Sequence, residues 1–214
     1  MNASLKNKKV LITCGPTWVA LDEIRVISNQ STGEMGHFLA EEFRNAGAKV
    51  TLLEGPVTHA FAAQGIEIIK FNFYDELLVL IGQELIKDFN IVVHAAAVSD
   101  FRPAAKSEKK TSSQLPYWDL RLVPTLKIID MMKKLNPKIF LVGFKLEPQL
   151  KQSLLKTKTR DLFERSQCDL VVANTMERRS YQGYIVDSSG RILSSQSQKR
   201  GLAKNLVKKM KDLL

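Results

Sequence analysis

The sequence predicts a doubly wound, mostly parallel α/β fold of the Rossmann-like type. Apolar runs of strand length alternate with amphipathic segments of helix length along most of the 214 residues. The strand-like runs are rich in Val, Ile and Leu without polar alternation, which is typical of strands covered by helices on both faces. The alternation and the predicted burial together favour a parallel sheet between two helical layers.

Each expected element follows from its own pattern. The nearly continuous apolar runs predict the strands Val10–Cys14, Val50–Glu54, Ile66–Phe71, Ile91–Ala97, Ile139–Phe144 and Asp169–Ala173. The amphipathic segments between and after them predict the helices Gly33–Ala46, Tyr74–Phe89, Thr125–Lys134, Glu147–Arg165 and Lys199–Leu214. In the last helix, lysines fall between apolar residues that recur every three to four positions, namely Leu202, Leu206, Met210 and Leu213. We therefore expect a surface helix with a solvated basic face.

Two regions interrupt the alternation. Asp100–Pro124 is polar and lysine-rich, and it ends in a strand-like segment, Tyr117–Val123. An excursion of about 20 residues inside a compact domain is usually functional or an oligomer contact. The segment from Tyr181 to Leu193 predicts a hairpin, with strands Tyr184–Val186 and Arg191–Leu193 around the turn Asp187–Gly190. Because no linker or internal repeat is visible, we expect residues 1–214 to form one domain.

Composition limits the functional classes. A hydrophobic fraction of 44% excludes a disordered chain, and the two cysteines, Cys14 and Cys168, lie in apolar segments typical of buried thiols in a reducing compartment. No apolar run is long enough to span a bilayer, and the polar start lacks a signal peptide, so we expect a cytoplasmic protein without membrane partners. The net charge of +10 favours polyanionic partners, which include nucleic acids and phosphorylated small molecules.

Glycines follow the first strand at an unusual spacing. Gly15 ends the strand, but the Gly-x-Gly-x-x-Gly fingerprint of dinucleotide-binding folds is absent. Gly33 and Gly36 instead open the first helix, after an insertion that contains Arg25 and Asn29. Free amides at that helix N-terminus would form a phosphate site at the carboxyl edge of the sheet. A plain turn with packing glycines is an equal alternative.

Small residues end the fourth strand. Ala95, Ala96 and Ala97 allow a ligand to approach the backbone, and Asp100 then places a carboxylate at the rim. Alternatively, the alanines fill a tight helix–sheet contact and Asp100 caps a turn.

Five separated segments occur in an order that resembles one enzyme family. They are Ile12–Thr17, the string from Arg25 to Gly36 (RVISNQSTGEMG), Ala95–Pro103, Val142–Phe144 and Asp169–Asn174. Together they resemble phosphopantothenoylcysteine synthetase, also called phosphopantothenate–cysteine ligase, which is the synthetase domain of the coenzyme A biosynthesis flavoproteins. The resemblance extends from Lys9 to the last helix. In many bacteria this domain follows a flavin-dependent decarboxylase, for which 214 residues leave no room. The resemblance therefore implies a stand-alone synthetase without flavin, served by a separate decarboxylase.

The family's reaction has two steps. The carboxylate of 4′-phosphopantothenate attacks the α-phosphate of CTP or ATP, with Mg²⁺, to give an acyl-nucleotidylate and pyrophosphate. The amine of cysteine then displaces the nucleotide and forms an amide. The resemblance also implies a homodimer.

Individual site residues follow from the matching positions. Arg25 resembles the arginine that grips the substrate phosphate from the neighbouring subunit, and Asn29 resembles the catalytic asparagine that contacts the activated pantothenoyl group. Ala96, Ala97 and Asp100 match positions that line the shared substrate and nucleotide pocket. The other nucleotide-binding positions are Gly15, Ser31, Gly33, Gly36, Ala95, Phe144, Lys158 and Asn174, together with Asp100.

The lysine positions depart from the family pattern. The catalytic loop lysine aligns best with Lys109, and Lys106 is the alternative. The lysine expected one helical turn after Lys158 is Leu162, with Arg165 as a candidate replacement. We assign no protein-bound metal site, and no metal or catalytic role to His37, His59 or His94. The choice between CTP and ATP stays open.

Two other functional classes remain as alternatives. An NAD(P)-dependent oxidoreductase would share the fold, and Glu54 ends the second strand like a ribose-binding acid, but both the glycine fingerprint and a Tyr-x-x-x-Lys pair are absent. A nucleic-acid-binding module would use the basic C-terminal segment. Lys199–Leu214 contains no aromatic residue on which bases could stack.

Overall fold

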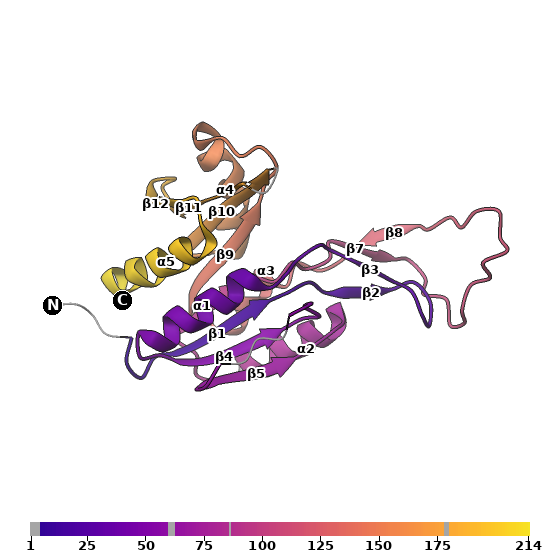
Figure 1. Cartoon of the computed structure of the whole chain (residues 1–214), viewed down its shortest axis with the longest axis horizontal. Helices are drawn as coiled ribbons and strands as arrows, with labels where there is room; N and C mark the ends of the chain where they lie inside the picture. Colours follow the sequence, from indigo (N-terminus) through magenta and orange to yellow (C-terminus); the bar gives the residue numbers. More distant parts are fainter. Residues whose placement is uncertain (1–4, 60–62, 86, 178–179) are drawn as a thin grey trace.

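The computed structural model of the chain describes residues 5–59, 63–85, 87–177 and 180–214. Its centre is an eight-stranded sheet with the order β12-β11-β10-β9-β6-β1-β4-β5 (Figure 1). The strands are β1 Lys9–Cys14, β4 Lys49–Glu54, β5 Ile66–Lys70, β6 Ile91–His94, β9 Phe140–Leu146, β10 Leu170–Glu177, β11 Ser180–Asp187 and β12 Ile192–Gln196. The strands from β5 to β10 are parallel, and β11 and β12 add an antiparallel edge. The predicted fold class is confirmed.

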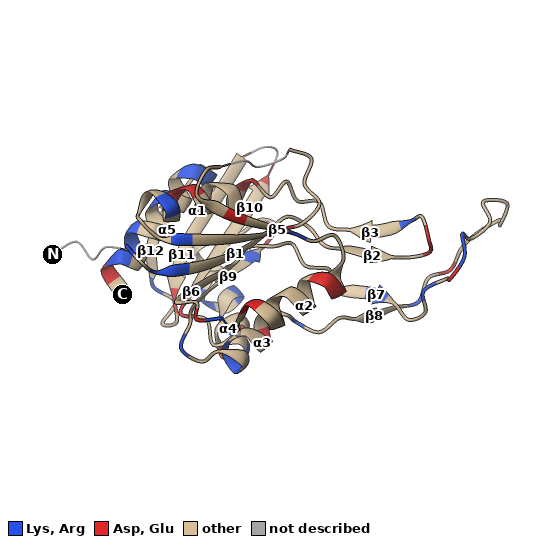
Figure 2. Cartoon of the chain, turned by 90° about the horizontal axis from the view of Figure 1, so that it is seen from below, with Lys and Arg blue, Asp and Glu red and all other residues tan. Residues whose placement is uncertain are grey.

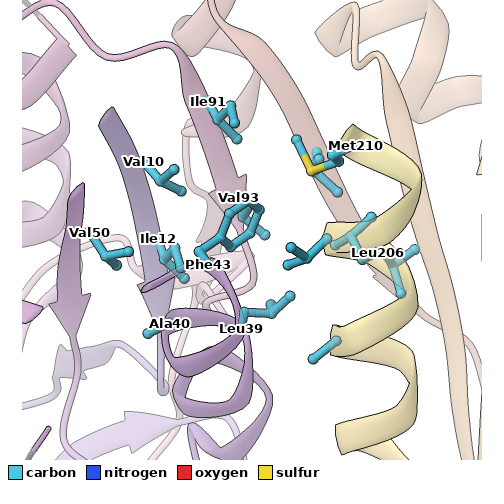
Figure 3. Packing of buried hydrophobic residues seen from close by; sticks show 14 of the residues in the cluster. Val10, Ile12, Leu39, Ala40, Phe43, Val50, Ile91, Val93, Leu206 and Met210 are labelled. Carbon is cyan, nitrogen blue, oxygen red and sulfur yellow. The ribbon is translucent and has the colours of Figure 1, made fainter. Parts of the chain in front are cut away.

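Helices cover both faces of this sheet. The first face carries α1 (Glu34–Asn45) and α5 (Lys199–Leu213), and the second carries α2 (Tyr74–Leu85), α3 (Ile129–Leu135) and α4 (Leu155–Ser166). Phe43 of α1 and Leu206 and Met210 of α5 gather over Ile12 and Val93 of the sheet (Figure 3). Burial of such side chains contributes about 1.5–3 kcal/mol each to folding.

Helix starts differ from the predicted bounds for local reasons. The expected helix from Thr125 begins only at Ile129, because the amide and hydroxyl of Thr125 bond to the carbonyls of Asp100 and Ser99. The helix expected from Glu147 begins at Leu155, after a short 3₁₀ turn, since Pro148 and the positive φ of 52° at Gln149 interrupt it. Both predicted starts were therefore wrong.

Two other predicted ends extend too far. The helix predicted to reach Phe89 ends at Leu85, and residue 86 lies outside the described residues. The strand predicted to reach Ala97 ends at His94, although an isolated bridge still joins Ala97 to Pro16.

An arm, formed by residues 17–28 and 101–124, projects beyond the sheet (Figure 1). It contains two antiparallel pairs, β2 (Trp18–Ala20) with β3 (Val26–Ser28) and β7 (Phe101–Pro103) with β8 (Leu122–Pro124). The strand predicted over Tyr117–Val123 is wrong for most of its length. The arm exposes the large apolar side chains of Ile24, Val26, Phe101, Leu115, Tyr117, Leu120 and Leu122.

The C-terminal basic segment is a surface helix, as predicted. Leu202, Leu206 and Met210 are buried, whereas Leu213, Lys204 and Lys208 are exposed. Figure 2 shows the basic residues along this helix. The predicted hairpin is also present, with longer strands, as β11 and β12. In the described part of the chain, no helix is long and apolar enough to cross a membrane.

Candidate functional site

A cavity of about 1130 Å³ opens at the carboxyl edge of the sheet. From β1 the chain adds β4 and β5 on one side and then β6, β9 and β10 on the other, so the strand order reverses at β1. Ligands of doubly wound folds bind at this switch point. The cavity is lined by residues 29–36, 94–100, 125–129 and 144–147, and by side chains of α4, β10, β11 and α5.

Two glycines allow α1 to begin at the cavity. Gly33 has φ 72°, and an added Cβ would lie 2.6 Å from Val57. At Gly36 an added Cβ would lie 2.2 Å from the Cβ of Cys14, so only glycine lets α1 lie this close to β1. The first-turn amides of α1, which have no partners inside the helix, therefore lie at the cavity wall.

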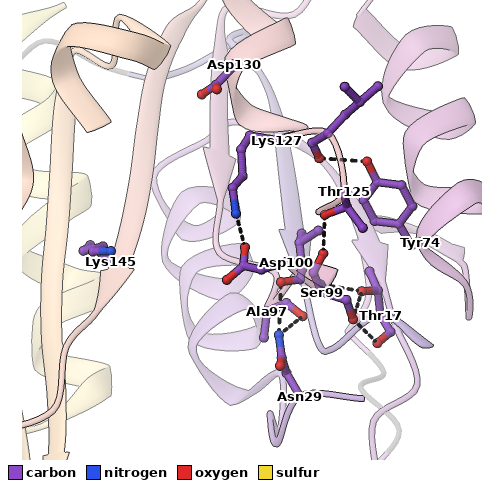
Figure 4. A network of polar contacts seen from close by, with 12 residues as sticks. Thr17, Asn29, Tyr74, Ala97, Ser99, Asp100, Thr125, Lys127, Asp130 and Lys145 are labelled. Carbon is purple, nitrogen blue, oxygen red and sulfur yellow. Dashed lines mark hydrogen bonds and ion pairs between the residues drawn. The ribbon is translucent and has the colours of Figure 1, made fainter. Parts of the chain in front are cut away.

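Asn29 joins the segment after β1 to the segment after β6. Its Nδ2 donates to the carbonyl oxygens of Ala97 at 3.2 Å and Val98 at 3.0 Å (Figure 4). Both amide hydrogens are thus used, and Oδ1 is left as an acceptor beside the cavity.

A buried network of hydroxyl groups holds the same segment after β6. The amide of Ser99 donates to Thr17 Oγ1 at 2.9 Å, and Thr125 Oγ1 donates to the carbonyl of Ser99 at 2.7 Å (Figure 4). Together with Asn29, these contacts fix the backbone that precedes Asp100 from three separate parts of the chain. Such buried, satisfied networks specify one arrangement.

Ion pairs surround the cavity. Lys127 pairs with Asp100, and Glu147 accepts both Lys158 at 2.9 Å and Lys145 at 3.2 Å. The hydrogen bond from Lys158, reinforced by Lys145, lowers the pKa of the Glu147 carboxyl. Among the described residues, five basic and four acidic side chains line the cavity, a net charge of +1. Much of the protein's net charge of +10 therefore lies outside the cavity. An anionic ligand must replace the carboxylates as the partners of these lysines.

Most of the predicted site residues meet in this cavity. Those that line it are Asn29, Ser31, Gly33, Gly36, Ala95, Ala96, Ala97, Asp100, Phe144, Lys158 and Asn174. Gly15 does not line it but supports the turn, with its N atom 3.5 Å from the Cβ position of Gly33. Sequence reasoning missed His94, Lys127, Lys145, Glu147 and Lys199, which also line it. For Lys145 a signal existed, since it directly follows Phe144 at the end of an expected strand.

Arg25, Lys106 and Lys109 do not line the cavity of their own chain; all three lie on the arm. Arg25 contacts Asp22 at 3.3 Å, donates to the Thr111 carbonyl at 3.2 Å and lies 5.3 Å above the Trp118 ring. Burial raises the pKa of the Asp22 carboxyl. Hydrogen bonds from the amides of Arg25, Ile24 and Thr111, together with the charge of Arg25, lower it by more, so the pKa lies below its usual value. These contacts place the guanidinium on the arm.

One cluster of potential metal ligands occurs among the described residues. The ligand atoms of Cys14, His37 and Glu54 lie within 4.8 Å of one another. Glu54 is fully buried and already accepts contacts from His37 and Lys70, and burial raises the pKa of the Cys14 thiol to about 12. The carboxylate is thus engaged inside the protein, and it is not available to bind the ribose of a dinucleotide as the oxidoreductase alternative requires.

Comparison with known proteins agrees with this geometry. The profile of the DNA/pantothenate metabolism flavoprotein C-terminal domain matches residues 5–214. The coenzyme A biosynthesis bifunctional protein CoaBC of Thermococcus kodakarensis is 44% identical over 176 residues, which cover 81% of this chain and 43% of that protein. The chain spans about half the length of the curated relatives that it matches.

Solved structures show the same fold. The crystal structure of the DNA/pantothenate metabolism flavoprotein from Streptococcus pneumoniae has a TM-score of 0.85 and 26% identity, covering 97% of this chain and 100% of that one. A Cab2 variant in complex with phosphopantothenate-cysteine has a TM-score of 0.79 at 21% identity, covering 97% of this chain and 87% of that one. The family resemblance expected from the sequence is confirmed: the chain belongs to the DNA/pantothenate metabolism flavoprotein C-terminal domain family.

Proposed function

We propose that this chain is a ligase that joins 4′-phosphopantothenate to cysteine at the expense of a nucleoside triphosphate. The observation that carries the proposal is the junction of Asn29 with the Ala97–Val98 backbone, in the cavity that the first turn of α1 also lines. The cavity is large enough for a nucleotide beside a pantothenoyl chain. The names of the relatives, one bound to phosphopantothenate-cysteine, support the same substrates.

The two proposed steps balance as follows. A carboxylate oxygen of phosphopantothenate attacks the α-phosphorus of the triphosphate, and pyrophosphate leaves. The amine of cysteine then attacks the acyl carbon and loses a proton, and the nucleoside monophosphate leaves. Since no electrons are transferred, the reaction needs no flavin.

This chain's residues hold the reactants for these steps. Asn29 Oδ1 accepts an N–H of the pantothenoyl chain, because both hydrogens of its amide are already used. The small side chains of Ala95–Ala97 let the acyl group lie against the backbone. Holding the carboxylate against the α-phosphorus replaces a bimolecular encounter, which is a large part of such catalysis.

The triphosphate is held by amides and lysines. The first turn of α1 supplies the N–H groups of Met35 and Gly36, whereas the amide of Glu34 already donates to Thr32 Oγ1 at 3.4 Å. Lys127, Lys145 and Lys158 exchange their carboxylate partners for phosphate oxygens. The freed carboxylates of Asp100 and Glu147 are oxygen ligands of the kind that Mg²⁺ accepts with phosphates. Mg²⁺ would screen the charge of the triphosphate.

We further propose that the active form is a homodimer. The arm exposes an apolar surface, including Tyr117 at 74% and Phe101 at 53%, that a partner would cover. It also carries Arg25, Lys106 and Lys109 away from their own cavity. A second copy could therefore deliver these cations to the neighbouring cavity, where Arg25 binds the substrate phosphate bidentately.

Pyrophosphate release tests the proposal and its open choice of nucleotide. The protein is incubated with phosphopantothenate and Mg²⁺ and with CTP, ATP, GTP or UTP in turn. We expect release with CTP or ATP, and amide product after cysteine is added. The product is a carboxylated thiol, and a separate decarboxylase would act on it.

A further inference from the structure

His94 lies at the end of β6 with one ring nitrogen unused by the protein. In the sheet it pairs with Thr13 of β1 and Gly143 of β9. His94 is only 7% exposed, and it lines the cavity. The side chains of Ile129 and Leu162 lie over Gly143 on the neighbouring strand, so one flank of this site is apolar.

The hydrogen bonds of Thr13 fix the tautomer of the ring. Thr13 Oγ1 lies 2.9 Å from His94 Nδ1 and accepts the amide of Ala96 at 3.2 Å. Thr13 is fully buried, and among the described residues only Nδ1 is within reach to accept its hydroxyl hydrogen. Since a buried hydroxyl hydrogen without an acceptor is costly, Thr13 donates to Nδ1. The proton of the neutral imidazole is then on Nε2.

Since His94 lines the cavity and its Nε2 atom is not fully enclosed, we infer that the Nε2–H group is accessible from the cavity. No described residue accepts a hydrogen bond from it. Among the described residues, the side-chain atoms that are both fully enclosed and without a hydrogen-bond partner are Thr175 Oγ1 and Tyr181 Oη. His94 Nε2 is not among them, so this atom keeps some accessible surface. A buried ring that keeps an unused donor at a cavity wall is better explained by a ligand than by packing, because an apolar residue would fill the same place without a polar group.

We propose that His94 is a phosphate-binding residue, which donates its Nε2–H to a phosphate oxygen of the bound nucleoside triphosphate. The inference rests on the proposed use of a triphosphate by this site. It adds a contact from the sheet to those of the lysines and of the α1 amides.

The surroundings of the ring select this ligand. Burial lowers the pKa of His94 to about 4, so the ring is neutral near pH 7 and offers a single donor. Phosphate oxygens accept hydrogen bonds. Basic side chains from β9 and α4, namely Lys145, Lys158 and Arg165, line the same cavity and would hold the remaining phosphate charge. A neutral donor fits this position, because the neighbouring side chain of Leu162 has no polar group.

Binding of inorganic tripolyphosphate tests the inference without any turnover. Calorimetric titration compares the wild type with H94L, which removes the donor, and H94Q, which retains an N–H donor. We expect H94L to lose about tenfold to a hundredfold in affinity for tripolyphosphate and for CTP or ATP. H94Q should recover part of the loss, and cytidine and adenosine should bind all three proteins alike. Wild-type affinity of H94L for tripolyphosphate would overturn the inference, as would a loss confined to phosphopantothenate.

Nitrogen NMR of the wild type gives a readout that does not depend on a variant's folding. The ring should show a protonated Nε2 and an unprotonated Nδ1, and tripolyphosphate should shift the Nε2–H resonance downfield. An unshifted Nε2–H at saturation would refute the contact. If triphosphate binding depends on His94 but no phosphopantothenoylcysteine forms, the proposed function fails and this inference stands. If product forms and H94L binds tripolyphosphate normally, only this inference fails.

Discussion

The side-chain amide of Asn29 lies 3.0 Å from the carbonyl oxygen of Val98, across 69 residues of sequence. Together with the bond to Ala97, this contact orients Asn29 with its oxygen toward the cavity. The asparagine expected from the sequence to contact the activated substrate therefore also holds together the two backbone segments that form the cavity wall.

Substituting Asn29 by Asp should damage product formation far more than folding. The carboxylate has no hydrogen to donate and would face two carbonyl oxygens, so we expect at least a hundredfold loss of turnover, or about 2.7 kcal/mol or more in the barrier. N45D, at the exposed end of α1, makes the same charge change outside the cavity. Equal turnover of N29D and N45D would contradict the assigned role.

Mixing two inactive variants tests whether the arm acts across a dimer. R25A and N29D should each be inactive alone. If Arg25 serves the neighbouring cavity, random mixed dimers contain one intact site and restore about a quarter of wild-type activity. Steady-state rates of the refolded mixture measure this. Activity that stays at the level of the single variants would show that Arg25 and Asn29 serve one chain.

The loop lysine should act on the first chemical step. K109Q should slow pyrophosphate release without cysteine about tenfold to a hundredfold, because a contact to a charged group is worth roughly 1.5–3 kcal/mol. Lys208 on α5 carries the same charge far from the cavity, and K208Q is the control. Equal slowing by both variants would mean that the basic charge acts only as a diffuse field.

A matched pair of glycine substitutions tests the close approach of α1 to β1. G36A places a Cβ 2.2 Å from Cys14, and overpacking of this kind costs about 1–3 kcal/mol. Gly82 in α2 has no atom within 4 Å of its Cβ position, so G82A should stabilise the protein by about 0.5–1 kcal/mol. Urea unfolding measures both, and a neutral G36A would argue against the tight contact.

Burial of neutral His94 predicts a loss of stability in acid. Its folded-state pKa of about 4 lies below the ordinary 6.5, so between these values the unfolded chain binds the proton that the folded chain does not. The stability present above pH 6.5 should fall by about 3 kcal/mol as the pH drops to 4. H94Q should lack this part of the slope, whereas H59Q, at an exposed position, should keep it. Identical pH profiles for wild type and H94Q would contradict the account.

The sheet and its cavity were predictable because apolar strands carry a direct sequence signal. Val10–Cys14 and Val50–Glu54 are nearly continuous runs, and both lie in central strands. The arm was not predictable as strand pairs, since β2 and β3 are three residues each and enclose no glycine or asparagine turn. Short pairs of this kind depend on tertiary contacts such as that between β2 and β7.

The site was predictable at its glycines and at Asn29, because the Arg25–Gly36 string is long and specific. The ion pairs were not, since they join residues that are distant in sequence. Lys127 was assigned to the interior of a helix, whereas the bonds of Thr125 hold it in the extended segment before α3, where it reaches Asp100. The order of residues in the sequence does not reveal such an ion pair.

The decisive assay for the ligase reaction measures pyrophosphate and phosphopantothenoylcysteine in the same sample. The wild-type protein is incubated with phosphopantothenate, cysteine, Mg²⁺ and either CTP or ATP. We expect one pyrophosphate for each amide formed, and pyrophosphate should appear even before cysteine is added. Folded wild-type protein that gives neither product with any of the four nucleoside triphosphates would contradict the proposed function.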